Sequence, residues 1–247
     1  MGKMIAVWGT PNSGKTTLAM KLAESLYLQG KRRKLMIMVV FTDVTTPAVP
    51  VVFPNYRDEE VYSVGALLAK TDLTVDDVFS YTTFTHGKDN QGFLGYKGTE
   101  NSHSHPAYTK EKAELMFDIL NANTDYVLVD CMNCPKDSLM TEIALKKADS
   151  VIWMATPDLK SISYMLSQKS VLTAQGFMRP EMMIVVNTNF PDCAMPPDAA
   201  KANLGHVDFV LPYSSALSLQ MMEGSIGENL KDRKYMKAVS VIAAKVR

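Results

Sequence analysis

The residues best suited to chemistry in this sequence form a short loop close to its start. The loop reads Gly-Thr-Pro-Asn-Ser-Gly-Lys-Thr from Gly9 to Thr16 and matches the phosphate-loop (P-loop) pattern G-x-x-x-x-G-K-[ST]. In such a loop, glycines let backbone N–H groups converge on phosphate oxygens. A lysine then reaches the β- and γ-phosphates, and a hydroxyl binds Mg²⁺. Lys15 and Thr16 have the right types and positions for these two tasks.

The elements on either side of the loop support this interpretation. Residues 4–9 form an apolar run that predicts a buried strand, and the pattern from about 15 to 29 predicts a helix. A helix that starts at Lys15 directs the positive end of its dipole at a bound anion. The residues that we expect to bind nucleotide in this loop are Gly9, Thr10, Pro11, Asn12, Ser13, Gly14, Lys15, Thr16 and Thr17.

A P-loop also needs a carboxylate close to the metal ion. Asp130 follows the apolar run 126–129, and open α/β sheets bind ligands at the carboxyl ends of their strands. We therefore predict that Thr16 and Asp130 form the metal site. Asp43 follows the run 35–41, and it could orient the attacking water, contact Mg²⁺ or cap its own loop. The candidate catalytic residues are Lys15, Asp43 and Asp130.

Apolar runs and helical patterns alternate along most of the chain. Further runs lie at 151–155, 182–186 and 208–211, and helical patterns lie at about 109–121, 138–147, 159–175, 214–222 and 228–245. Runs without alternation are typical of strands buried on both faces. The pattern predicts an α/β fold with a mostly parallel, doubly wound sheet between two helix layers, a three-layer sandwich.

The chain is expected to form one domain over residues 1–247, with an irregular insertion at about 44–108. Three prolines punctuate the start of the insertion, and residues 59–80 indicate one or two helices. Residues 82–106 are predicted to form a long loop. Long loops in compact domains are usually functional or mobile.

The composition excludes some classes of protein. The 247 residues include 26 Lys and Arg and 26 Asp and Glu, so no net charge favours a polyanion and DNA is not expected as a strong partner. No apolar run is long enough for a membrane-spanning helix. Three cysteines give no disulfide framework, and the N-terminal residues lack the pattern of a secretory signal. We therefore expect a cytoplasmic protein.

Longer stretches resemble one known group of proteins. The segments are 124–162 (TDYVLVDCMNCPKDSLMTEIALKKADSVIWMATPDLKSI), 182–189 (MMIVVNTN) and 208–225 (DFVLPYSSALSLQMMEGS). Together with the P-loop, they resemble in order and spacing the MinD/ParA group of P-loop ATPases, which includes the CpaE/TadZ-like pilus-localisation proteins. The resemblance implies a P-loop NTPase fold, ATP and Mg²⁺ as cofactors, and a homodimer as one possible state of assembly.

The resemblance also implies roles for residues at matching positions. Those implied to bind phosphates and Mg²⁺ are Gly14, Lys15, Thr16 and Thr17. Asp130 would be the acid of the second switch loop, Asn187 would meet the adenine edge, and Pro212 and Tyr213 would line the base pocket. Guanine-reading relatives place an Asp shortly after the Asn, whereas Asn187 is followed by Thr-Asn-Phe. We therefore expect ATP rather than GTP.

The P-loop departs from the group at a position that bears on catalysis. The group's loop reads Lys-Gly-Gly-x-Gly-Lys-Thr, and its first Lys reaches across a dimer to the partner's phosphates. Here that position is Thr10, and Pro11 and Asn12 replace the two glycines. Some pilus-associated relatives also depart from the pattern, which favours that branch. Because the transition state needs cationic stabilisation, we expect hydrolysis to be slow or to need a partner.

Two further sets of residues have side chains that bind metals. Cys131 and Cys134 form C-x-x-C directly after Asp130, and two copies across a dimer axis would supply four thiolates. Small residues in a loop are the simpler interpretation. The histidines that raise the same question in the insertion are His86, His103 and His105. For them, a solvated loop is the simpler interpretation.

The predicted last helix is basic on one side and apolar on the other. From Lys231 to Arg247 the chain has six basic residues and one acid. The apolar residues that recur at helical spacing are Met236, Val239, Ile242 and Val246. The pattern fits a helix on an anionic membrane, which would place the protein peripherally at the inner face of the membrane. It also fits a terminal helix docked on the sheet, and we prefer docking.

These observations predict an ATPase that acts as a nucleotide-dependent positional switch. ATP and Mg²⁺ would close the loops 43–47 and 130–137 and so change a dimer or partner surface. The partners would belong to a pilus or secretion machine, a plasmid-partition system or a septum. A small-molecule kinase or ATP-dependent ligase, with a substrate pocket in the insertion, is one alternative. A nucleotide-binding scaffold without hydrolysis is another, because the early Lys is missing.

Overall fold

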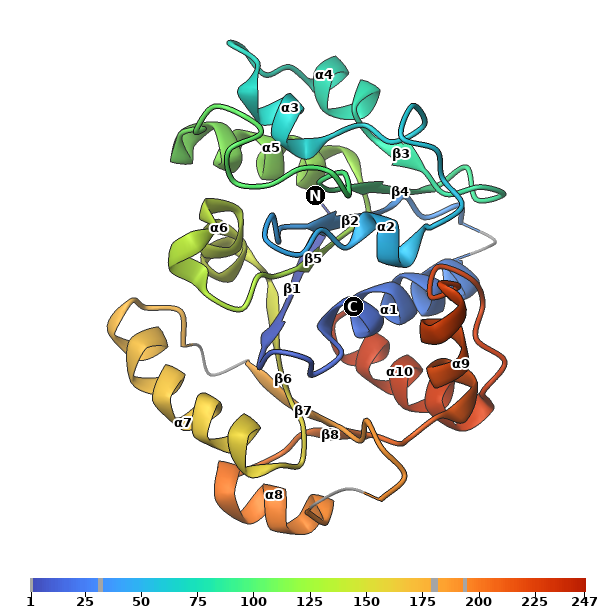
Figure 1. Ribbon diagram of the computed structural model, residues 1–247, viewed down its shortest axis with the longest axis vertical. Coiled ribbons are helices and arrows are strands. Elements are labelled where there is room, and N and C mark those ends of the chain that lie inside the picture. Colours follow the sequence, from blue (N-terminus) through green and yellow to red (C-terminus); the bar gives the residue numbers. More distant parts are fainter. Residues whose placement is uncertain (1, 31–32, 179–181, 193–194) are drawn as a thin grey trace.

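The centre of the molecule is a twisted β-sheet with helices on both faces (Figure 1). The computed structural model describes residues 2–30, 33–178, 182–192 and 195–247, and within them the sheet has eight strands in the order β3-β4-β2-β5-β1-β6-β7-β8. β3 and β4 are antiparallel, whereas the other neighbouring strands described are parallel. The predicted mostly parallel, doubly wound α/β fold is therefore confirmed.

The elements follow one another as strand, helix and loop along most of the chain. The strands are β1 (Lys3–Gly9), β2 (Ile37–Phe41), β3 (Thr83–Phe84), β4 (Gln91–Leu94), β5 (Tyr126–Asp130), β6 (Ser150–Ala155), β7 (Met183–Asn187) and β8 (Phe209–Leu211). The helices are α1 (Lys15–Gly30), α2 (Val49–Val52), α3 (Val64–Ala69), α4 (Val75–Ser80), α5 (Lys110–Asn123), α6 (Leu139–Lys147), α7 (Leu159–Ala174), α8 (Pro197–Leu204), α9 (Ser215–Glu223) and α10 (Arg233–Lys245). A 3₁₀ turn, η1 (Pro135–Asp137), precedes α6.

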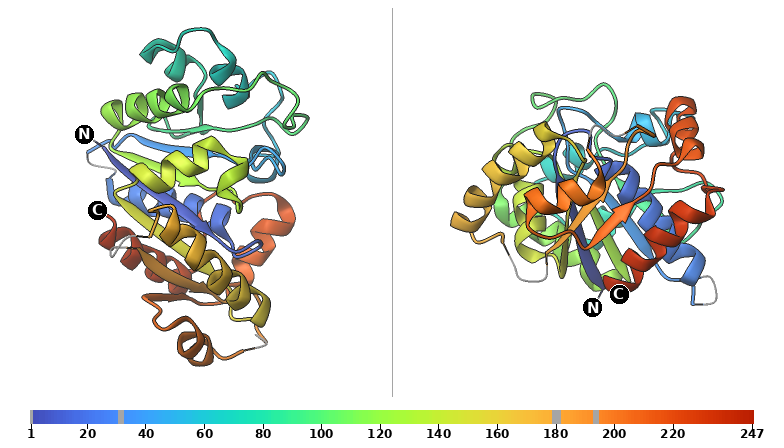
Figure 2. Two further views of the ribbon diagram at one scale, coloured as in Figure 1. Left: turned by 90° about the vertical axis from the view of Figure 1, so that its left-hand side faces the viewer. Right: turned by 90° about the horizontal axis from the view of Figure 1, so that it is seen from below.

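Two hydrophobic cores, one on each face of the sheet, explain why the strands are apolar without alternation. In β1, Ile5 and Val7 belong to one core, and Ala6 and Trp8 belong to the other. The first core is completed by α1, α9 and α10, and the second by helices from α3 to α7. Figure 2 shows these helix layers on either side of the sheet. Both ends of the chain lie on the same side of the molecule.

The stretch 44–108 has more regular structure than the sequence predicted. It contains α2, α3 and α4, and both β3 and β4 lie within residues 82–106, where a long loop was expected. That expectation was wrong, because Gln91–Leu94 pairs in parallel with β2 and is buried along its length. The strand was missed because only two of its four residues, Phe93 and Leu94, are apolar, which is too short a run to indicate a strand.

Two helices also differ from the sequence prediction. α8 was not expected, because its apolar residues are three small alanines and one leucine, which form no strong apolar stripe. The last helix was expected from about residue 228 but begins at Arg233, where Asp232 caps it by accepting a hydrogen bond from the backbone N–H of Tyr235 at 3.0 Å. The segment between α9 and α10 instead has its backbone hydrogen-bonded to the buried side chains of Lys21 and Glu24 in α1.

The apolar side of α10 packs against α1 and the sheet. Val239, Ile242 and Val246 are buried in the core, and Met236 packs at its edge. The docked interpretation of the last helix is therefore confirmed, because the side chains that a membrane helix would insert into lipid are already covered. In the described ranges, no helix combines the length and the apolar character that crossing a bilayer requires.

Candidate functional site

The P-loop connects the carboxyl end of β1 to the start of α1, and two of its glycines are required by its shape. Gly9 has a φ of +150° and Gly14 a φ of +86°, values that favour glycine. A Cβ at Gly9 would lie 2.1 Å from the carbonyl oxygen of Met154, and a Cβ at Gly14 would lie 2.5 Å from Nδ2 of Asn187. The loop is therefore packed closely against the ends of β6 and β7.

Lys15 holds its ammonium group inside the site. Its Nζ donates hydrogen bonds to the carbonyl oxygen of Thr10, at 3.1 Å, and to Oδ1 of Asn133. Burial lowers the pKa of Lys15, and the nearby negative charge of Asp130 is the main influence that opposes this shift. A buried ammonium that keeps donor capacity is well suited to bind an anion such as a phosphate.

Asp130 ends β5 beside the first turn of α1. Its Oδ2 accepts a hydrogen bond from Oγ1 of Thr16 at 2.5 Å. Its Oδ1 is buried and has no hydrogen-bond partner among the described residues. Burial raises the pKa of Asp130 to about 6, although the charge of Lys15 and the bond from Thr16 act in the opposite direction.

These donor atoms fit a magnesium ion. A buried carboxylate oxygen without a partner is energetically costly, and a cation or a cation-bound water next to it would remove that cost. A threonine hydroxyl beside an aspartate carboxylate is the kind of oxygen pair that Mg²⁺ takes together with phosphate oxygens. The structure thus brings together Lys15, Thr16 and Asp130, which the sequence predicted as neighbours.

Asp43 follows β2 by two residues and turns back on its own loop. Its Oδ1 accepts from the backbone N–H groups of Thr45, at 2.8 Å, and Thr46, at 3.0 Å. Its Oδ2 accepts from the hydroxyl of Thr46 at 2.8 Å. Of the alternatives left open by the sequence, the geometry shows the cap. Asp43 is still close enough for its charge to act on the pKa values of Lys15 and Asp130, so a role for Asp43 in catalysis stays a prediction.

Thr10 occupies the position of the lysine that MinD/ParA loops place early in the P-loop. Thr10 is 1% exposed, and its hydroxyl lies 3.1 Å from the hydroxyl of Ser161 in α7. The same Ser161 oxygen accepts from the backbone N–H of Thr156 at 2.9 Å. The side chain at this position therefore points into the protein. Ser13 and Thr17 are also buried, whereas Pro11 and Asn12 lie on the surface.

Asn187 lies at the end of β7 and braces the P-loop. Its Nδ2 donates to the carbonyl oxygen of Ser13, at 2.9 Å, and to Oδ1 of Asn189, at 2.6 Å. Asn189 in turn donates from Nδ2 to the carbonyl oxygen of Asn12 at 2.9 Å. Because backbone carbonyls can only accept, both amide orientations are fixed. Sequence reasoning missed Asn189, since an isolated Asn two residues from Asn187 belongs to no recognised spacing.

Pro212 and Tyr213 follow β8 directly, at the same edge of the sheet as Asn187. The register of the sheet places Leu211 opposite Asn187. Both residues are half-buried. This position is compatible with a base pocket next to the P-loop, and the role of Pro212 and Tyr213 in that pocket stays a prediction.

The loop between β5 and α6, residues 131–138, holds residues that sequence reasoning did not single out. The backbone N–H of Met132 lies 2.9 Å from the hydroxyl of Thr42 and 3.0 Å from that of Thr141. Thr42 lies next to Asp43, so this buried contact links the loops that follow β2 and β5. Only the position of the loop after Asp130 could have drawn attention to these residues, because hydroxyl side chains are common in loops.

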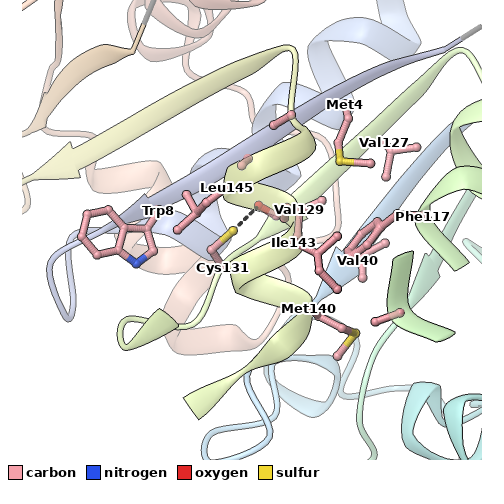
Figure 3. Close-up of a cluster of buried hydrophobic side chains, with 14 of the residues drawn as sticks. Met4, Trp8, Val40, Phe117, Val127, Val129, Cys131, Met140, Ile143 and Leu145 are labelled. Carbon is pink, nitrogen blue, oxygen red and sulfur yellow. Dashed lines mark hydrogen bonds between the residues drawn. The ribbon is translucent and has the colours of Figure 1, made fainter. Parts of the chain in front are cut away.

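The cysteines and histidines do not form a metal site in the part of the chain that the structure describes. Cys131 is buried in the core beside Val129, as Figure 3 shows, whereas Cys134 is exposed. No group of three or more metal-binding side chains occurs among the described residues. Burial raises the pKa of the Cys131 thiol, which disfavours a thiolate ligand. Cys193 lies outside the described residues.

Two of the three histidines of the insertion have structural contacts. His105 bonds through Nε2 to Oε1 of Glu100 at 2.8 Å, and the ring of His86 stacks on Tyr56 with the centroids 4.1 Å apart. His103 is exposed.

Comparisons with solved structures show which known proteins share this fold. No protein-family model and no curated protein matches the sequence. Many solved structures match, and three examples align over nearly all of both chains. They are the septum site-determining protein MinD with Mg-ADP from Pyrococcus horikoshii (18% identity, 100% of this chain and 96% of that chain, TM-score 0.75), a ParA family ATPase from Chlorobium tepidum (13%, 98% and 98%, 0.77) and MinD in the MinC:MinD complex from Aquifex aeolicus (15%, 99% and 95%, 0.75). This chain has the MinD/ParA fold.

The MinD/ParA fold confirms the architecture expected from the motifs. In this fold the P-loop, Asp130, Asn187 and Tyr213 come from separate strand ends, and the parallel sheet gathers them at one edge. Identities between 13% and 18% show shared architecture only, so the activity has to be argued from the site itself. The assignment to a CpaE/TadZ-like branch stays a prediction.

Proposed function

We propose that this protein is an ATP-binding, slowly hydrolysing ATPase that serves as a nucleotide-dependent positional switch. The observation that carries the proposal is the meeting of Lys15, Thr16 and Asp130, with one oxygen of Asp130 buried and unpaired among the described residues. A cation for phosphate, a hydroxyl and a carboxylate for Mg²⁺ are the parts that nucleotide hydrolysis by a P-loop requires.

Each residue has one task in this proposal. Lys15 binds the β- and γ-phosphates, and the backbone N–H groups of the P-loop surround them. Thr16 and Asp130 hold Mg²⁺, which when bound neutralises charge on the phosphates. Asn187 supports the P-loop and faces the adenine, with Pro212 and Tyr213 beside it.

Structures with the same fold support the proposed ligand and type of partner. MinD of Pyrococcus horikoshii is complexed with Mg-ADP, and MinD of Aquifex aeolicus is in a complex with MinC. By analogy, we propose that nucleotide state controls a homodimer and a surface for a partner protein here. The partner belongs to a localisation system such as a pilus or secretion machine, a partition system or a septum.

A non-hydrolysing scaffold is the second candidate, and one observation favours it. Thr10 replaces the early Lys, and its side chain is bonded inward to Ser161. No cation from that position can reach a phosphate across a dimer. Slow hydrolysis therefore requires another positive group, whereas a scaffold requires none.

The proposal is tested by replacing Lys15. Lys15→Ala removes the cation that faces the phosphates, so we expect the affinity for ATP–Mg²⁺ in calorimetry to fall by at least about 100-fold. Lys245→Ala, at an exposed position in the last turn of α10, is the matched control and should bind like the parent. Unchanged affinity of the Lys15 variant would place the nucleotide site elsewhere.

Product analysis then separates the candidate functions. ADP and phosphate alone indicate an ATPase, whereas ADP with a phosphorylated acceptor indicates a small-molecule kinase. Binding without turnover, including in the presence of a candidate partner, indicates a scaffold.

A further inference from the structure

Asn133 contacts three parts of the nucleotide site. Its backbone carbonyl oxygen accepts from Nε1 of Trp8, at 3.0 Å, and from the hydroxyl of Tyr164, at 2.7 Å. Its side-chain Oδ1 accepts from Nζ of Lys15. These contacts join the loop 131–138 to β1, α7 and α1. A change in the hydrogen bonds of Lys15 would therefore act directly on the side chain of Asn133.

The backbone on both sides of Asn133 is fixed more firmly than its side chain. Trp8 is fully buried and, with Tyr164, binds the carbonyl oxygen from two different elements. The preceding N–H, that of Met132, contacts the buried hydroxyls of Thr42 and Thr141. The side chain of Asn133 has the bond to Lys15 as its one hydrogen bond to described residues. The part of Asn133 that can move is therefore its side-chain carboxamide, while its backbone stays in place.

The donors of Lys15 can be counted against their acceptors. An ammonium group has three N–H donors. The carbonyl oxygen of Thr10 belongs to the P-loop itself and keeps one of them. In ATP, the β- and γ-phosphates take the other two, so none is left for Asn133. In ADP, the β-phosphate takes one, and the third donor can stay with Asn133.

We infer that Asn133 makes the site distinguish ATP from ADP, because ATP displaces its side chain from Lys15 and ADP does not. The inference rests on the proposed function, since it requires a nucleotide at the P-loop. Asn133 acts through Lys15 and is therefore a positioning residue. Its hydrogen bond opposes the binding of ATP but not that of ADP.

The consequence is a measurable bias in nucleotide affinity. A hydrogen bond to a charged group changes a binding constant by about tenfold or more when it must be broken. The parent protein therefore binds the triphosphate more weakly, relative to ADP, than a protein without the Asn133 amide. Removing this acceptor should raise the ratio of Kd for ADP to Kd for the triphosphate by about tenfold.

The experiment measures that ratio by calorimetry with Mg²⁺ and either ADP or AMPPNP, a triphosphate analogue that resists hydrolysis. The variants are Asn133→Ala and Asn133→Leu, and the leucine keeps nearly the shape of asparagine without its acceptor. Asn203→Ala is the matched control, because Asn203 is exposed in α8 and bonds only within its own helix among the described residues. We expect the ratio to rise about tenfold in both Asn133 variants and to stay unchanged in the control.

Two results would overturn the inference. An unchanged ratio in both variants would show that the bond to Lys15 does not compete with the γ-phosphate. A fall in the ratio would show that Asn133 binds the γ-phosphate directly. In both results the parent protein binds ADP and AMPPNP. If the parent binds neither nucleotide, the proposed function itself has failed.

Discussion

The protonation of Asp130 depends on whether a metal ion is bound in the site. Asp130 is 6% exposed, and burial raises its pKa to about 6. Without a bound metal ion, ionising it is therefore less favourable in the folded protein than in the unfolded chain, despite the nearby charge of Lys15. A bound Mg²⁺ would favour the ionised form, so metal affinity should strengthen as the pH rises through that value.

The raised pKa of Asp130 predicts a pH-dependent cost in stability. Below the pKa of an unfolded aspartate, near 3.9, the group is protonated in both states and costs nothing. Between that value and about 6, the unfolded chain loses the proton and the folded protein keeps it, so stability falls as the pH rises. Asp130→Asn keeps an acceptor for Thr16 and should be more stable by about 3 kcal/mol at pH 7.5 without nucleotide or metal.

Urea unfolding of the parent and the Asp130→Asn variant from pH 4 to pH 8 checks this expectation. The gain should disappear near pH 4. Asp118→Asn, whose carboxylate forms a surface ion pair with Lys147, is a control that should show no such gain. A gain of equal size at pH 4 and pH 8 would mean that ionisation of Asp130 is not its cause.

Part of the site could be predicted at the residue scale and part could not. Lys15, Thr16 and Asp130 were identified because a loop motif and the end of an apolar run mark them. Asn133 and Asn189 were not, because their importance comes from atoms that meet across the fold. A single amide side chain in a loop carries no spacing that a sequence can show.

At the scale of elements, α1 links the nucleotide site to the C-terminal part of the chain. Lys21 is fully buried in α1, and its Nζ donates to the carbonyl oxygens of Ile226, at 2.9 Å, and Glu228, at 2.7 Å. Glu24 lies 3.3 Å from Lys21 and accepts from the backbone N–H of Leu230 at 2.9 Å. Lys21 and Glu24 thus hold the segment 226–230, which precedes α10, against α1, the helix that starts at the P-loop.

Breaking this pair should cost much more than breaking an exposed one. Glu24→Ala leaves the Lys21 ammonium buried with only carbonyl partners and leaves the N–H of Leu230 unpaired, so we expect a loss of about 3–5 kcal/mol. The double variant Lys21→Met, Glu24→Leu removes both charges and should be less destabilised than Glu24→Ala alone. Urea unfolding of the three proteins gives the comparison.

The control is the exposed pair of Lys110 and Glu114 in α5, whose charged atoms are 3.6 Å apart. Glu114→Ala should cost less than about 1 kcal/mol, because water screens this pair. If Glu24→Ala cost no more than Glu114→Ala, the buried pair would not be what fastens the segment 226–230.

Elements with a strong pattern were predictable, and elements that depend on their neighbours were not. The long apolar runs of β1, β5 and β6 and the helices between them were found close to their bounds, since both faces of each strand are buried. β4 was missed because its pairing with β2, and not its own composition, makes it a strand. α8 was missed because most of its side chains face solvent.

At the scale of the whole molecule, the parallel sheet brings every predicted ligand of the nucleotide to one edge. The loops after β2 and β5 lie at that edge and are joined by the hydrogen bond from the backbone N–H of Met132 to the hydroxyl of Thr42. A ligand bound there would act on both loops at once. This arrangement suits a protein whose surface changes with its nucleotide.

We therefore expect ATP and Mg²⁺ to change the oligomeric state. Light scattering should give the mass of one chain, 27.4 kDa, without nucleotide and twice that mass with ATP and Mg²⁺. Phosphate release measured in the same sample should be slow, because Thr10 supplies no cation. Lys15→Ala should stay monomeric in both conditions. A parent protein that stays monomeric with bound ATP would rule out the dimeric switch and leave the scaffold.

The two tryptophans of this chain are neighbours, and this has a practical consequence. Trp8 and Trp153 lie opposite each other on β1 and β6, with ring centroids 5.5 Å apart, and Trp8 donates to the carbonyl oxygen of Asn133. Ultraviolet emission from tryptophan therefore comes from one place in the molecule, directly behind the loop 131–138. The unmodified protein carries its own optical probe of that loop, and a stopped-flow trace after mixing with nucleotide would time its response without an attached dye.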